Sequence, residues 1–134
     1  MQVALKAGAG YFAAVFGLGF VLGTVRVLLV APAVGVLPAT LIELPIMLLA
    51  SWRICAWSVR RFKVPSELRA RLAMGALAFT LLIAAEAALG VWGFGLTLQQ
   101  LLTGYRDAGP LLGLAAQIAW AVFPLIQARL TSTR

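Results

Sequence analysis

The chain alternates four long apolar runs with short links that carry most of its charge. The runs cover residues 8–30, residues 38–59, a stretch that begins after Pro65-Ser66-Glu67 and ends near Trp92 or Phe94, and residues 110–128. Each run is close to the roughly 20 residues that a helix needs to cross a hydrocarbon core about 30 Å thick. The pattern predicts an all-α fold in which residues 1–134 form one domain, a four-helix transmembrane bundle.

The link between the third and fourth runs, residues 96–109, differs from the other two links. Apolar residues recur there at helical spacing and alternate with polar ones: Leu98, Leu101, Leu102 and Tyr105 against Gln99, Gln100, Thr103 and Arg106. This spacing predicts a short amphipathic helix that lies in the membrane interface. The alternative is a disordered loop.

Composition agrees with a membrane protein and argues against several other classes. The 134 residues are 63% hydrophobic and 11% charged, whereas a soluble domain has about 25% charged residues. The net charge of +7 comes from short links, without the basic face or aromatic platform that nucleic-acid binding needs, so we expect no nucleic-acid partner. There is no histidine and one cysteine, Cys55. We therefore expect no metal, no cofactor and no disulfide, and interpret Cys55 as a small buried hydrophobe.

Basic residues are distributed unequally between the two sides that four spans would create. One side would hold Lys6, Arg60, Arg61, Lys63, Arg69, Arg71, Arg129 and Arg134, and the other side only Arg106. Because cytoplasmic loops carry the excess of lysine and arginine, this asymmetry predicts that both termini are cytoplasmic.

Each apolar run contains a strongly polar residue in the half that would face the outer side: Arg26, Glu43, Glu86 and Gln117 in turn. A polar or ionisable group inside hydrocarbon is costly unless it is paired, faces a cavity or serves a function. Counting about 1.5 Å per residue places all four roughly 6–12 Å below the outer boundary. We therefore predict one buried polar cluster, in which Arg26 and Glu43 are natural partners on antiparallel neighbouring helices.

Each of these residues also has a simpler interpretation. Glu43 follows Thr40 at capping-box spacing and would then only cap its helix. Arg26 would extend its head group to the outer surface, and Gln117 would make an ordinary hydrogen bond between helices. Glu86 has the fewest alternatives because its side chain is short. Glycine and alanine share the helix faces of Arg26, Glu86 and Gln117, which indicates that these faces point inward.

Several short motifs resemble a group of small bacterial four-span integral membrane proteins of unassigned function. The resemblance covers most of the chain and is carried by Gly10-Tyr11-Phe12-Ala13, Gly19-Phe20-Val21-Leu22-Gly23-Thr24-Val25-Arg26, Glu43-Leu44-Pro45-Ile46-Met47-Leu48 and Ala85-Glu86. It implies a bacterial inner membrane location and the same four-helix topology. It implies no activity, ligand or catalytic residue.

Two classes of function follow from the residues. The first is a non-enzymatic integral inner-membrane protein whose Arg26, Glu43 and Glu86 cluster fixes helix packing, acting as an accessory or assembly component. Its expected partners are the lipid bilayer and a second copy or another membrane protein. The alternative is a small oligomeric proton-linked transporter or channel that uses Glu43 or Glu86. Between Glu86 and the cytoplasmic end, only Thr80 offers a polar side chain on the third run, which favours the first class.

Enzyme activity is the least favoured class. The sequence contains none of the common nucleophile, metal or phosphate-loop motifs, and the first run carries an arginine where small multidrug transporters carry their glutamate. A membrane enzyme built on Arg26, Glu43 and Glu86 stays open as an alternative.

Overall fold

The computed structural model of the chain describes residues 1–104 and 106–132, is 91% helical and has no strand among those residues. Its elements are α1 (Gln2–Val25), the π-helical η1 (Arg26–Val30), α2 (Ala31–Val34), α3 (Val36–Phe62), α4 (Leu68–Ala88), the π-helical η2 (Leu89–Gly93), α5 (Leu98–Gly104) and α6 (Ala108–Ser132). The predicted all-α class is confirmed.

Four helices are long and apolar enough to cross a membrane: Gln2–Val34, Val36–Phe62, Leu68–Gly93 and Pro110–Ser132. They correspond to the four apolar runs, and most extend beyond them because the helices continue into the links. The first helix runs through η1 and α2 until Gly35, whose φ of 98° reverses the chain into α3. Glycine reaches this positive φ without the steric cost of a Cβ atom.

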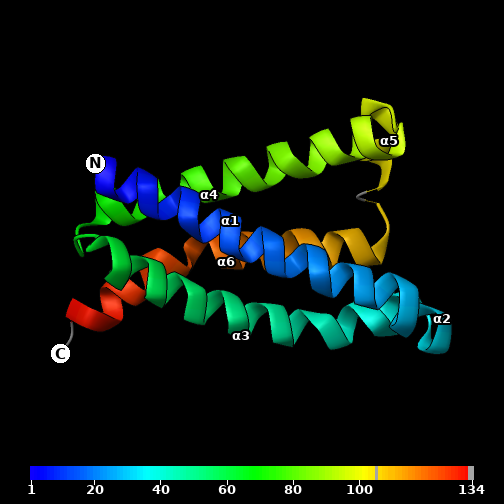
Figure 1. Cartoon of the computed structure of the whole chain (residues 1–134), viewed down its shortest axis with the longest axis horizontal. Helices are drawn as coiled ribbons and strands as arrows, with labels where there is room; N and C mark the ends of the chain where they lie inside the picture. The colour runs from blue at the N-terminus through cyan, green and yellow to red at the C-terminus, as the bar shows by residue number, and fades with distance from the viewer. Residues whose placement is uncertain (105, 133–134) are drawn as a thin grey trace.

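The long helices form a ring in which α1 and α6 each pack against both α3 and α4. Figure 1 shows the N-terminus, the α3–α4 turn and the end of α6 at one end of the bundle, with α2 and α5 at the other. We call the first the basic end, because it holds the predicted basic group, and the second the open end. Arg134, counted in that group, lies outside the described residues.

One member of the basic group has a structural role that the charge count did not reveal. Arg71 is buried, with 4% of its surface exposed. Its Nε donates to the Pro65 carbonyl at 2.8 Å and its Nη2 donates to the Val64 carbonyl at 3.3 Å. These carbonyls belong to the α3–α4 turn, which begins at Lys63 in the left-handed conformation. Arg71 therefore ties the first turn of α4 to the turn that precedes it.

The tightest helix packing occurs in the half of the bundle near the basic end. Buried side chains there include Ala4, Ala7, Tyr11, Cys55, Ala70, Met74 and Ala78. A Cβ atom added at Gly8 of α1 would lie 2.7 Å from the Met74 carbonyl oxygen of α4, and one added at Gly75 would overlap the Ala121 carbonyl oxygen of α6. Glycine is thus required where α4 approaches both neighbours, as small residues are at close contacts between membrane helices.

The short helix predicted in the link after α4 is present as α5. Thr97 and Gln100 bond reciprocally, the Thr97 amide to Gln100 Oε1 at 2.9 Å and the Gln100 amide to Thr97 Oγ1 at 3.2 Å. This capping box fixes the start of the helix. Leu101 packs over Gly90, where an added Cβ would lie 2.5 Å from Leu101 Cδ2. Its placement in a membrane interface stays a prediction, and Tyr105 lies outside the described residues.

The close approach at Gly75 predicts a specific loss of stability. Gly75→Ala should lower the midpoint of thermal unfolding in detergent, because overpacking typically costs about 1–3 kcal/mol. Gly17→Ala is the matched control, since a Cβ there meets nothing within 4 Å and alanine favours helix by up to about 1 kcal/mol. Equal midpoints for the two variants would contradict the packing described here.

Candidate functional site

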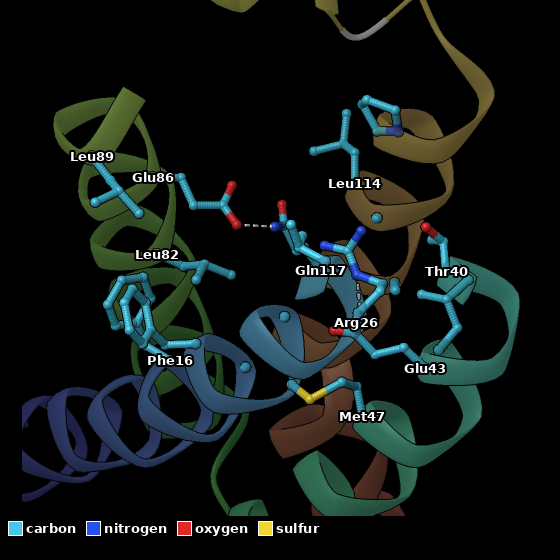
Figure 2. A pocket seen from close by; sticks show the side chains of 18 of the residues that line it. Phe16, Arg26, Thr40, Glu43, Met47, Leu82, Glu86, Leu89, Leu114 and Gln117 are labelled. Atoms are coloured by element: carbon cyan, nitrogen blue, oxygen red, sulfur yellow. Dashed lines mark hydrogen bonds and ion pairs between the residues drawn. The ribbon is translucent and has the colours of Figure 1, made fainter. Parts of the chain in front are cut away.

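The four polar residues singled out in the sequence all lie in the half of the bundle near the open end. Arg26 is the first residue of η1, Glu43 lies in α3, Glu86 lies near the end of α4 and Gln117 lies in α6. Each side chain is half-buried. Figure 2 shows the guanidinium of Arg26 directed toward Glu43 and the carboxyl group of Glu86 facing the amide of Gln117.

The first pair lies between η1, which continues α1, and α3. Arg26 Nε lies against Glu43 Oε2, and the two side chains are 29% and 19% exposed. The capping-box interpretation of Glu43 is wrong, because α3 begins at Val36 and the Thr40 hydroxyl donates to the Val36 carbonyl at 2.9 Å. Thr40 therefore bonds back along the helix instead of capping it. The Arg26 side chain points into the bundle toward its neighbour.

The second pair connects α4 and α6. Gln117 Nε2 donates to Glu86 Oε1 at 2.6 Å. Gln117 therefore makes the hydrogen bond between helices that its simplest interpretation anticipated, and its partner is Glu86. Together the two pairs connect all four long helices, with each pair joining two neighbours.

All four residues line one cavity of about 890 Å³, which is bounded by α1, α3, α4 and α6 and reached by α5. Most of its lining is apolar. Among the described residues that line it, the charged side chains are Arg26, Glu43 and Glu86. Val15, Ser51, Leu82 and Trp120 are buried and line the cavity toward the packed half. Gln100 and Leu101 of α5 also line it, so the short helix covers part of the cavity.

Trp120 is a site residue that the sequence analysis missed. It is 3% exposed, and its indole Nε1 is buried without a hydrogen-bond partner. The Tyr11 hydroxyl donates to the Trp120 carbonyl at 2.8 Å, and the two ring centroids lie 4.7 Å apart. The position of Trp120 in the sequence could have identified it, because a residue three positions after Gln117 lies on the same face of the helix.

Two π-helical segments adjoin the site. η1 begins at Arg26 itself, and η2 begins three residues after Glu86. A π-turn widens the helix and changes which residues share a face, and such turns often occur at functional sites. Hydrophobic periodicity does not distinguish a π-turn from an ordinary α-helical turn, so the sequence predicted ordinary helix in both stretches.

The packed half offers little polar continuity from the cavity to the basic end. Thr80 of α4 is exposed on the outside of the bundle, and its hydroxyl donates to the Ala76 carbonyl at 2.8 Å. Tyr11, Met74 and Ala78 fill the interior at that level. The arrangement suits binding or helix pairing better than movement of a proton through the bundle.

No family model, curated protein or solved structure matches this chain. The resemblance to small four-span bacterial proteins therefore stays a prediction.

Proposed function

We propose that this chain is a small non-enzymatic integral membrane protein, acting as an accessory or assembly component, in which two polar pairs fix helix packing near the open end. One observation carries the proposal. Arg26 with Glu43, and Gln117 with Glu86, each join two neighbouring helices where a cavity replaces the close packing of the other half.

The energetic argument concerns charge in an apolar surrounding. In a bilayer, Arg26 and Glu43 form an intramembrane ion pair, because either charge alone would be strongly disfavoured there. Losing one partner of a buried pair typically costs about 3–5 kcal/mol. Hydrogen bonds between membrane helices contribute less, on average about 0.6 kcal/mol. We therefore expect removal of Arg26 or Glu43 alone to destabilise the bundle more than loss of the bond between Gln117 and Glu86, because it leaves an unpaired charge behind.

We propose a bacterial inner membrane location, with the lipid bilayer and a second copy or another membrane protein as partners. Exposed apolar side chains on the open half support contact with lipid or protein, such as Leu28 at 66% and Leu29 at 69%. Leu98 and Leu102 of α5 are 68% and 63% exposed, which supports an interfacial position for that helix.

The proposed orientation places the basic end, and with it both termini, in the cytoplasm. A reporter that is active only in the periplasm should therefore stay inactive when fused after residue 134, and active when inserted into the link before α6. A strong periplasmic signal from the C-terminal fusion would overturn this orientation.

A small oligomeric proton-linked transporter or channel is the second candidate. The cavity favours it, because Glu43 and Glu86 both line a space large enough for a solute. The packed interior around Tyr11 and Met74, and the outward position of Thr80, disfavour it. Oligomers would be needed for a larger pathway, since four helices alone enclose little space.

Flux in proteoliposomes separates the two candidates. The assay imposes a pH gradient and follows proton entry with an internal pH-sensitive dye. We expect proton flux into vesicles that contain the wild-type protein to be no faster than flux into protein-free vesicles. The variants are Glu43→Gln and Glu86→Gln, with Glu67→Gln as the control because Glu67 is exposed at the start of α4. Proton movement that either site variant abolishes while staying folded would favour the transporter instead.

A further inference from the structure

The cavity contains a carboxyl group that lacks a cationic partner among the described residues. Arg26 lies against Glu43, whereas Glu86 accepts a hydrogen bond from the neutral amide of Gln117. One arginine and two glutamates are the charged residues among the described lining. With both glutamates ionised, the cavity carries one negative charge in excess, and Glu86 is the carboxyl group that lies beside a neutral donor.

The lining of the cavity is mostly apolar and partly aromatic. The lining includes Phe16, Phe20, Phe94 and Trp120. Aromatic faces attract cations, and tryptophan does so most strongly. The Oε1 atom of Gln117 is buried without a hydrogen-bond partner, which adds a second partial negative charge beside the carboxyl group. The volume of about 890 Å³ lies within the range of about 300–1,000 Å³ that is typical of small-molecule sites.

We propose that this cavity binds a lipophilic organic cation, with the Glu86 carboxylate as its counter-ion and the apolar and aromatic wall, including Trp120, as the surface that receives its hydrophobic groups. Charge complementarity selects this class over a neutral lipophile, because a neutral ligand leaves Glu86 unpaired in an apolar space. It also selects against an anion, which Glu86 would repel.

This binding role goes beyond the packing role proposed above, and the two roles share Glu86, which also accepts the hydrogen bond from Gln117. Packing near the open end uses chiefly Arg26 with Glu43, whereas binding uses Glu86 and the space between the helices. A bound cation without transmembrane flux leaves the packing proposal intact, and failure to bind a cation leaves it intact as well.

The test uses tetraphenylphosphonium, a permanent lipophilic cation, and the full chain purified in detergent. Equilibrium dialysis should show saturable binding to the wild type. Glu86→Gln should weaken binding by about tenfold or more, because losing one partner of a desolvated charge pair is costly. Glu67→Gln should bind as the wild type does. Triphenylphosphine oxide is a neutral analogue of similar shape. It should bind to the wild type at least about tenfold more weakly than the cation does. It should bind equally to Glu86→Gln and Glu67→Gln.

A second variant keeps the carboxylate and removes the space. Gly113 of α6 lines the cavity, and an added Cβ there meets nothing within 4 Å. Gly113→Leu should therefore fold but bind the cation more weakly. Gly17 is exposed and equally unobstructed, so Gly17→Leu should fold and leave cation binding unchanged. Equal binding of the cation and its neutral analogue, or unchanged affinity in both Glu86→Gln and Gly113→Leu, would overturn the proposal.

Discussion

Close backbone approach in the packed half is the constraint on which the rest of this bundle depends. At Gly75 of α4 there is no room for a Cβ atom beside the Ala121 carbonyl of α6. At Gly8 of α1 there is little room for a Cβ atom beside the Met74 carbonyl of α4. Dispersion contacts and shape complementarity hold membrane helices together where lipid tails are as apolar as leucine. That contact is concentrated near the basic end, where Arg71 also binds the turn between α3 and α4.

Near the open end a different set of interactions takes over. There the helices surround a cavity. A hydrogen bond from Gln117 to Glu86 connects α6 to α4 there, the same two helices that close backbone contact joins at Gly75 in the other half. In our proposal the pair of Arg26 and Glu43 holds α1 to α3, while Gln117 and Glu86 hold α4 to α6. The same geometry leaves Glu86 facing a space lined by apolar groups and Trp120. Helix pairing and ligand binding therefore become two uses of one polar layer.

The sequence predicted the parts of this structure that depend on local pattern or on depth. Long apolar runs predicted the four helices. Counting residues from the ends of the runs predicted that the four polar residues lie at one level, and all four line the cavity; the ion pair of Arg26 and Glu43 stays a prediction. The capping box between Thr97 and Gln100 is also a local pattern, because the two residues stand at capping-box spacing in the sequence. The cavity was not predictable, because it depends on how the helices approach one another. Nor were the roles of Arg71 and Trp120, because each depends on residues that the fold brings to it.

The central claim is that attraction between Arg26 and Glu43 stabilises the contact of η1, which continues α1, with α3 beside the cavity. Exchanging the two charges tests it most directly, with the midpoint of thermal unfolding in detergent as the readout. Arg26→Glu alone and Glu43→Arg alone should each lower the midpoint, because each places like charges together. The double exchange should recover most of the loss, because it restores an opposite pair at the same place. Losses that simply add in the double variant would contradict the claim.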